Sequence, residues 1–390
     1  MDIGTYFSFW GQFLIVALFQ VGGLGYMTAT TFLLLVLGRK SGLRDKIALQ
    51  QALDKQGMHG GAQLICFIIA TTVIFEITGM LLLLPVFVPD YGFRHGLWLA
   101  GFHSISAWTN ASFSLFKDSF IHYQPAVLLN LVIGGLVIFG GIGYEVILEL
   151  YLWGRARLLR TPSRIIFSLN FKVVTSTTLV VLSVGTVVFF FTELQNPETL
   201  GSLSLEKKMM SALFISVSTR TAGFNTIEIG KLSPDTLFIA TVLMFIGGSP
   251  GSTAGGIKTT TFRVLTSCTK AILQGKEEVL VYQRQVPISL ILKAVGVVIS
   301  SLSTVIVSTT LISFTDPNLN FIDTLFDVMS AFATVGLSTG ITASISAPAK
   351  LILVITMYVG RVGVLLLMAA LLGDPRLSII HYPEENLLVG

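Results

Sequence analysis

The chain has 390 residues, of which 53% are apolar and 12% are charged, and its mean hydropathy is +0.80. Soluble domains carry about 25% charged residues, so this charge density excludes a soluble enzyme. The net charge of +4 comes without a run of basic residues, which excludes a nucleic-acid binder and predicts an all-α polytopic membrane protein in the lipid bilayer.

Seven apolar stretches are long enough for membrane helices, which need about 20 residues each. They cover roughly residues 9–37, 62–88, 125–153, 174–191, 237–265, 288–314 and 349–372, and the fifth is interrupted. An odd number of spans places the two chain ends on opposite sides of the membrane.

Basic residues are distributed unevenly between the connections. The stretches 38–61, 154–172 and 262–293 carry five Lys or Arg each, whereas 89–124, 193–235 and 315–348 carry six between them. Because basic loops stay in the cytoplasm, the first three stretches are predicted to be cytoplasmic. Residue 1 is then outside and the C-terminus is cytoplasmic, in a multi-pass protein of the inner or plasma membrane.

The outer connections contain a repeated motif. Residues 106–113, 217–224 and 330–337 resemble one another, and Ser112, Gly223 and Gly336 hold the equivalent place at nearly equal intervals along the chain. Each unit is a span, a short apolar helix, a small-residue stretch and a second span. The predicted divisions are 1–61 (second half of repeat 1 and a cytoplasmic loop), 62–172 (repeat 2), 173–286 (repeat 3 with a broken inner helix) and 287–390 (repeat 4 and the C-terminal tail).

Each second span carries a glycine cluster, which begins at Gly140, Gly247 or Gly360 and follows the small-residue site at a nearly constant distance. The first span has the same cluster from Gly22, and counting back from it by that distance reaches positions before Met1. We therefore expect that the first unit lacks its outer span and re-entrant segment. The alternative is a chain that inserts with its N-terminus outside.

The small-residue stretches have the composition of an ion filter. Non-helical backbone at membrane depth is tolerated only where it lines a cavity or is buried in protein, and glycine permits the dihedrals that turn carbonyl oxygens inward. Carbonyls can replace the hydration shell of a monovalent cation, and the C-terminal ends of short helices add partial negative charge. The predicted filter residues are Asn110, Ala111, Ser112, Thr221, Ala222, Gly223, Thr334, Val335 and Gly336. The alternative is three helix-capping glycines in amphipathic hairpins.

The fifth stretch cannot form one continuous helix. Each glycine costs up to about 1 kcal/mol in a helix and proline about 3 kcal/mol, which predicts a loop of small residues across the permeation path. Its residues are Gly247, Gly248, Ser249, Pro250, Gly251, Ser252, Thr253, Ala254, Gly255, Gly256 and Lys258. The loop does not fit the phosphate-binding pattern GxxxxGK[ST], because Ile257 precedes Lys258.

Few ionisable residues fall within the predicted spans. Lys258 and Arg361 are the basic ones, and an ionisable residue in a membrane span is a functional candidate. A snorkelling or paired arginine is the alternative to a functional role for Arg361, but Arg361 lies at the middle of the last span, and its distance from either end argues against snorkelling. Acidic residues in spans are Glu76, Glu145 and Glu149, for which interhelical hydrogen bonding or pairing with a basic residue is expected and cation coordination is the alternative.

Several of these motifs carry a family resemblance. Residues 220–225, 247–261, 360–361 and the 382–390 tail resemble the KtrB-type membrane subunits of K+ uptake systems, in the TrkH/KtrB/HKT superfamily. The resemblance implies membrane–pore–membrane units around a pseudo-four-fold pore, with seven spans and three re-entrant helices in this chain. It also implies that the 247–258 loop is a gate and that the Arg361 side chain faces the pore below the filter.

The resemblance also implies partners. These are a second copy in a homodimer and a cytoplasmic KtrA-type regulatory subunit that binds ATP/ADP or NAD, while this chain binds no cofactor other than the transported or regulatory ions K+ and Na+. The basic cytoplasmic loops and the tail residues Glu384 and Glu385 are candidate docking surfaces. The implied function is the ion-translocating subunit of a Na+-responsive K+ uptake system.

One departure from the family pattern affects the choice of ion. The second filter of the family pattern reads Asn110-Ala111-Ser112 where the family has Asn-Ala-Gly, so a Na+-selective transporter of the same superfamily is the alternative. An intramembrane enzyme is rejected, because the five histidines are scattered at loops and ends. His103, the one nearest a filter, is expected to cap or pack a short helix.

Overall fold

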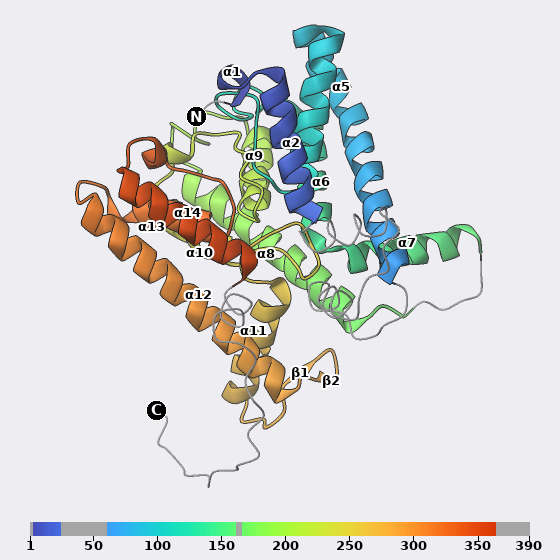
Figure 1. Cartoon of the computed structure of the whole chain (residues 1–390). Helices are drawn as coiled ribbons and strands as arrows, with labels where there is room; N and C mark the ends of the chain where they lie inside the picture. Colours follow the sequence, from blue (N-terminus) through green and yellow to red (C-terminus); the bar gives the residue numbers. More distant parts are fainter. Residues whose placement is uncertain (1–2, 25–60, 161–165, 364–390) are drawn as a thin grey trace.

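The computed structural model describes residues 3–24, 61–160 and 166–363, and these residues are mainly helical (Figure 1). The α-helices are α1 (Ile3–Tyr6), α2 (Phe9–Leu24), α5 (Gly61–Trp108), α6 (Val127–Ile142), α7 (Tyr144–Leu158), α8 (Leu169–Glu193), α9 (Leu205–Ser218), α10 (Pro234–Phe245), α11 (Thr259–Leu273), α12 (Ile288–Thr315), α13 (Phe321–Phe332) and α14 (Ala347–Val362). Two 3-10 turns, η1 (Ile229–Lys231) and η2 (Ile341–Ala343), and a small antiparallel hairpin of β1 (Leu280–Val281) and β2 (Arg284–Gln285) complete the described chain.

Three of the described helices are long and apolar enough to cross a membrane. They are α5, α8 and α12, and the bent pair α6 and α7 makes a fourth if it is counted as one span. The 25 residues of α8 and the 28 residues of α12 exceed the length that a hydrocarbon core of about 30 Å requires. Helices α2 and α10 are shorter and also apolar. The predicted stretches 9–37 and 349–372 extend beyond the described residues.

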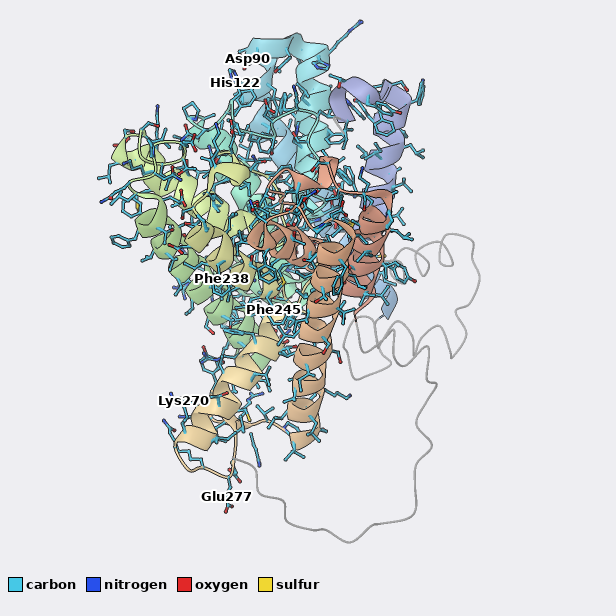
Figure 2. All side chains as sticks on the ribbon, turned by 90° about the vertical axis from the view of Figure 1, so that its left-hand side faces the viewer. Asp90, His122, Phe238, Phe245, Lys270 and Glu277 are labelled. Atoms are coloured by element: carbon cyan, nitrogen blue, oxygen red, sulfur yellow. The ribbon has the colours of Figure 1, made fainter. Side chains whose placement is uncertain are left out.

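Polar residues lie at two opposite ends of the molecule. Figure 2 shows Asp90 and His122 at one end and Lys270 and Glu277 at the other, with Phe238 and Phe245 of α10 between them. The connection predicted to be external and the one predicted to be cytoplasmic therefore lie on opposite faces of the helical body.

Helix α5 contains a break at Gly92, whose φ of 74° and ψ of 166° are not helical. The break separates the predicted span 62–88 from a second, shorter helical segment that ends at Trp108. The two segments run back along each other, since a Cβ on Gly96 would crowd the backbone of Val88. The chain thus enters the body and returns, which is the course expected of a re-entrant segment.

The third predicted span, 125–153, forms two helices that are sharply bent at their junction. Helices α6 and α7 meet at an angle of 105° at Gly143, whose φ of 100° is accessible to glycine at little cost. The Tyr144 amide donates to Gly251 O over 3.1 Å, and a Cβ on Gly143 would crowd Pro250 O. The glycine-rich loop of the fifth stretch therefore occupies the place that a straight helix would need.

Two apolar clusters form the core around the short helices. One joins α8, α9, α10, α12, α13 and α14, and the other joins α2, α5, α6 and α9. The largest fully buried side chains include Trp108, Phe224 and Phe326, which lie on or next to the short helices. The ends of these helices are consequently fixed by packing.

Candidate ion-binding site

Three short helical segments each lead into one of the predicted filter segments (residues 110–112, 221–223 and 334–336). These are the part of α5 after its break, α9 and α13. In every filter segment the first and third residues have positive φ and the middle residue does not. The values are 51° and 65° at Asn110 and Ser112, 67° and 67° at Thr221 and Gly223, and 54° and 89° at Thr334 and Gly336.

This alternation decides where the backbone carbonyls point. In an extended strand successive carbonyls point to opposite sides, whereas alternating left-handed and right-handed residues turn them toward one side. A residue other than glycine in the left-handed region costs roughly 1–2 kcal/mol, and such strain persists where the surrounding structure enforces it. Each segment can therefore offer a row of carbonyl oxygens, the ligands that replace water around K+ or Na+.

The three filter segments meet. A Cβ added to Gly223 would collide with Val335 O and with the side chain of Ser112, and one added to Gly336 would also collide with Ser112. The Ser112 hydroxyl donates to Val335 O. Segments far apart in sequence thus converge on one point, and the serine hydroxyl occupies one of the oxygens there.

Hydrogen bonds tie the residues after each filter segment back to the short helix before it. Ser106 Oγ donates to Phe113 O over 2.7 Å, and the Ser218 hydroxyl donates to Phe224 O. After the filter segment 334–336 the Asp327 carboxylate takes this role and accepts from Ser338 Oγ, Thr339 N and Thr342 Oγ1. These bonds hold the strained backbone in place.

His103 has the packing role that was expected of it. Its Nε2 accepts from the Leu115 amide over 3.3 Å and lies 3.1 Å from Ser114 Oγ. Nε2 is therefore unprotonated, and Nδ1 donates to Leu99 O over 2.8 Å. The ring stacks on Phe116, so this histidine fixes the chain beyond Ser112.

The glycine-rich loop (residues 246–258) joins α10 to α11 and is folded on itself. Gly247 N donates to Ile257 O over 2.9 Å, and Gly248 N donates to Gly255 O over 3.2 Å. A Cβ on Gly247 would collide with Gly255 O, so glycine is required where the two arms touch.

The same loop contacts α6 and the filter segments 110–112 and 334–336. Ser249 N donates to Gly141 O over 3.0 Å, and Thr253 N donates to Gly140 O over 3.2 Å. Asn110 Nδ2 donates to Thr253 Oγ1 over 2.9 Å. A Cβ on Gly255 would collide with the Thr334 side chain. The loop therefore lies directly against two of the three filter segments.

Three cationic side chains bind carbonyls of this loop. Arg361 Nη1 donates to Thr253 O over 2.7 Å, and Lys258 Nζ donates to Ala254 O over 2.9 Å. The third is Arg220, whose Nη2 donates to Gly247 O over 3.0 Å.

Arg220 is not among the residues predicted to form the site, because its position in the sequence places it with the outer connections. The repeat carries a signal that could have found it. Arg220 aligns with Thr109 and Ala333 in the other units, and all three positions are buried.

Arg361 also contacts helix α2. Its Nη2 donates to Gly22 O over 2.8 Å, in the glycine cluster of α2. In the same cluster a Cβ on Gly23 would crowd Thr109. Helix α2 therefore approaches the filter region as α6 and α14 do, where Gly140 and Gly360 leave no space for a Cβ beside Trp108 O and Phe332 O.

Comparison with known proteins identifies the family. The family model TrkH, described as a cation transport protein, matches residues 2–373. The chain belongs to the TrkH family. It is 35% identical over 390 residues to the Ktr system potassium uptake protein B of Bacillus subtilis (strain 168), covering all of this chain and 85% of the relative. It is 33% identical over 385 residues to the potassium/sodium uptake protein NtpJ of Enterococcus hirae, covering 97% of this chain and 83% of the relative.

A solved structure shows that the fold is shared within the TrkH family. The potassium transporter TrkH from Vibrio parahaemolyticus matches with a TM-score of 0.69 at 18% identity, over 94% of this chain and 72% of that chain. Family and relatives are membrane cation transporters, so the chain is a multi-pass membrane protein and not an enzyme.

Acidic residues of this TrkH-family chain contact backbone and side chains of neighbouring helices. Glu149 Oε2 accepts from Ser168 N over 2.9 Å, at the start of α8, and Glu145 Oε2 accepts from Asn170 Nδ2 over 3.1 Å. Glu76 is buried on α5, and its backbone carbonyl accepts from Ser104 Oγ over 2.7 Å. Interhelical hydrogen bonding, the expected role, thus describes Glu145 and Glu149.

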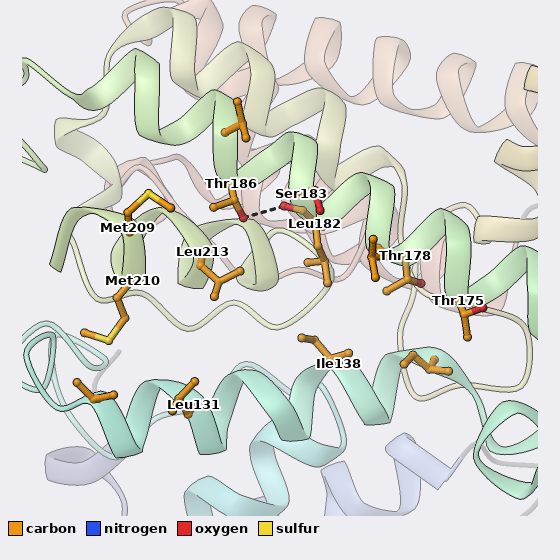
Figure 3. A pocket seen from close by; sticks show the side chains of 14 residues that line it. Leu131, Ile138, Thr175, Thr178, Leu182, Ser183, Thr186, Met209, Met210 and Leu213 are labelled. Atoms are coloured by element: carbon orange, nitrogen blue, oxygen red, sulfur yellow. Dashed lines mark hydrogen bonds between the residues drawn. The ribbon is translucent and has the colours of Figure 1, made fainter. Parts of the chain in front are cut away.

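An apolar groove of about 770 Å³ lies apart from the filter segments, between α6, α8 and α9. Figure 3 shows Ile138 of α6 facing Leu182 of α8, and Leu131 of α6 facing Met210 and Leu213 of α9. No residue of the filter segments lines this groove. It is a feature of the outer surface of the helical body.

Proposed function

We propose that this chain is the ion-translocating subunit of a K+ uptake system and that residues 110–112, 221–223 and 334–336 form its selectivity filter. One observation supports this most: three segments at nearly equal intervals along the chain share an alternation of positive φ and converge on Ser112, Gly223 and Gly336. The printed names of the two relatives, a potassium and a potassium/sodium uptake protein, agree with the proposal.

The units are arranged around one pore with pseudo-four-fold symmetry, and α2 stands as the inner helix of a fourth unit. Support comes from the approach of the α2 glycines to Arg361 and Thr109. Carbonyls from all units would share one cation, and the C-terminal ends of the short helices would add partial negative charge.

The glycine-rich loop is the gate of this pore. It crosses between α6 and the filter segments through Thr253 and Gly255, so a cation leaving the filter would meet it. Arg361 holds the loop from the opposite side. A fixed positive charge at that place competes with the permeant cation and slows conduction.

Ser112 supports a second candidate, a Na+-selective transporter. Its hydroxyl adds an oxygen at the meeting point and binds Val335 O, which changes both the size and the ligand set of the site. Na+ is smaller than K+ and suits a tighter set of oxygens.

The partners follow the family. A homodimer and a cytoplasmic KtrA-type subunit that binds ATP/ADP or NAD would supply the Na+ response and the nucleotide control. The tail residues Glu384 and Glu385 and residues 38–60 of the basic stretch 38–61 lie outside the described residues. The stretch 262–293 presents Lys270 and Glu277 at one end of the molecule (Figure 2). Co-purification of the full chain with such a subunit tests this part.

The function is tested by expressing the full chain in cells that lack K+ uptake systems and measuring uptake of ⁸⁶Rb+ and ²²Na+ separately. Faster Rb+ uptake than in cells with an empty vector, together with growth at low K+, supports K+ uptake. Na+ uptake without Rb+ uptake supports the second candidate. Uptake of neither ion at detectable protein levels contradicts both.

A further inference from the structure

Arg220 has a buried charge that its observed hydrogen bond does not fully satisfy. The residue is 6% exposed, and its Nη2 donates to Gly247 O. Its Nη1 has no hydrogen-bond partner, and within the described ranges its guanidinium pairs with no carboxylate. A guanidinium carries five N–H donors, and a buried charge is costly unless its donors are satisfied.

A small cavity lies at this guanidinium. Four elements enclose this cavity: the end of α9, α8, the glycine-rich loop and α6. The lining residues are Val217, Arg220, Thr178, Gly248, Val137, Ile138 and Gly141. The centre of a water-sized molecule can occupy about 10 Å³ of this cavity, which is close to the space that one water molecule requires.

A second unpartnered polar atom belongs to the same cavity. Thr178 Oγ1 is buried and makes no hydrogen bond to any residue that the structure describes, although threonines in helices commonly donate to the preceding turn. The cavity therefore has a donor, Arg220 Nη1, and a hydroxyl that can accept. A buried water typically binds two to four polar groups.

We propose that one buried water molecule bridges Arg220 Nη1 and Thr178 Oγ1, and that Arg220 so held is a positioning residue that fastens the glycine-rich loop to the filter segment 221–223. Arg220 immediately precedes Thr221, the first residue of that segment, and binds the first glycine of the loop through Nη2. The water completes the hydrogen bonding of the guanidinium and stabilises the glycine-rich loop in its observed position against the filter segments.

The second half of this proposal rests on the proposed function, whereas the first half does not. An experimental structure of the full chain at a resolution that shows ordered water tests the site directly. A density peak within hydrogen-bond distance of both Arg220 Nη1 and Thr178 Oγ1 is expected. An empty cavity, or a side chain that fills it, overturns the water site whether or not the chain transports K+.

Thr178→Val tests the consequence for transport, since valine keeps the shape of threonine and removes the hydroxyl. Loss of the water leaves the guanidinium unsatisfied and weakens the closed loop, so ⁸⁶Rb+ uptake per molecule of protein should rise about fivefold. Arg220→Gln should raise uptake in the same way. Thr178→Ser, which keeps the hydroxyl, should leave uptake at the wild-type level.

Thr177→Val is the matched control. Thr177 is the neighbouring residue, is equally buried and has an unpartnered Oγ1, yet it does not line the cavity. Its substitution should leave Rb+ uptake unchanged. Equal effects of Thr177→Val and Thr178→Val, or a lower yield of Thr178→Val with unchanged uptake per molecule, would overturn the positioning role. Wild-type protein that transports neither Rb+ nor Na+ would contradict the proposed function and leave the water site standing.

Discussion

Ser112 is the residue at which backbone strain coincides with the proposed ion-binding site. Its φ of 65° is the region that glycine adopts most readily, and Gly223 and Gly336 hold the equivalent places in the other units. The serine side chain lies against both glycines and donates to Val335 O. It therefore takes up a carbonyl that would otherwise be free to bind a cation.

Ser112→Gly should raise the ratio of Rb+ to Na+ uptake. The substitution removes the strain and releases Val335 O, and one released hydrogen-bond acceptor is worth about 1 kcal/mol, or roughly fivefold in the ratio. The measurement is ⁸⁶Rb+ and ²²Na+ uptake at equal protein levels. Ser119→Gly is the control, because Ser119 also has a positive φ of 53° and lies outside the filter segments. An unchanged ratio in Ser112→Gly would argue against a filter role for this residue.

At the scale of elements, close approach between helices depends on glycine at particular places. Gly140 of α6 lies against Trp108 O, and Gly360 of α14 lies against Phe332 O, so that each inner helix packs on the carbonyl end of its own short helix. The same α6 carries Gly135, where a Cβ would meet nothing within 4 Å. Packing therefore requires glycine at Gly140 and Gly360 but not at Gly135.

Gly140→Ala should therefore destabilise the fold, and Gly135→Ala should not. Forcing a methyl group against a backbone carbonyl costs about 1–3 kcal/mol, whereas alanine in open helix is favoured over glycine by up to about 1 kcal/mol. Thermal unfolding of the detergent-solubilised protein measures both. A Gly140→Ala protein that melts at the wild-type temperature would contradict the observed packing.

Hydrogen bonds to the Asp316 carboxylate connect the end of α12 to the start of α14, outside the membrane span. Asp316, which caps the end of α12, accepts from Ser346 Oγ over 2.7 Å and from Ser346 N over 3.1 Å. These hydrogen bonds hold the pKa of the Asp316 carboxyl below its ordinary value, and the bond from the Ser346 hydroxyl has the largest effect. A lowered pKa means that the ionised carboxylate is favoured in the folded state.

The contribution of these Asp316 hydrogen bonds to the stability of the fold should decrease in acid. It is fully present above the ordinary aspartate pKa of about 3.9 and is lost as the pH falls through the lower pKa of the folded state. The melting temperature of Asp316→Asn should thus lie below that of wild type at pH 7, and the two should converge toward pH 3. Ser346→Ala should narrow the difference at pH 7. A gap that is constant with pH would show that the Asp316 charge contributes nothing.

Hydropathy and spacing predicted the elements whose signals are periodic. The regular interval of the repeat predicted that 110–112, 221–223 and 334–336 are equivalent, and the structure gives all three the same alternation of positive φ. The glycines at 247–256 predicted the break between α10 and α11. The bend at Gly143 was not predictable in this way, because residues 144–153 are apolar enough to continue a span. The bend arises from a contact with Gly251, a residue that is distant in sequence.

At the scale of the whole molecule, the glycine-rich loop joins units that are distant in sequence. It contacts α6, two filter segments and, through Arg361, α14. Arg361 in turn binds Gly22 of α2, 339 positions away. The loop and this arginine together link α2 to α14, so a change in the loop alters contacts between units that are far apart in the sequence.

The loop can be shortened without pulling its ends apart. A Cβ on Gly247 would lie 2.9 Å from Gly256 Cα, and consecutive Cα atoms are about 3.8 Å apart. Deleting 248–255 and joining Gly247 to Gly256 therefore fits the existing geometry. Since the loop lies against two filter segments and binds Arg361, its removal should raise Rb+ uptake and weaken the response to a cytoplasmic regulatory subunit if it is the gate that we propose.

Uptake of ⁸⁶Rb+ by cells that express wild-type chain or the deletion variant, at matched protein levels, measures this effect. Thr253→Val keeps the loop and removes the hydroxyl that binds Asn110, so it should raise uptake by less than the deletion does. The deletion should leave the preference for Rb+ over Na+ intact, because the filter segments remain. Unchanged uptake in a folded deletion variant would show that the loop is not the gate.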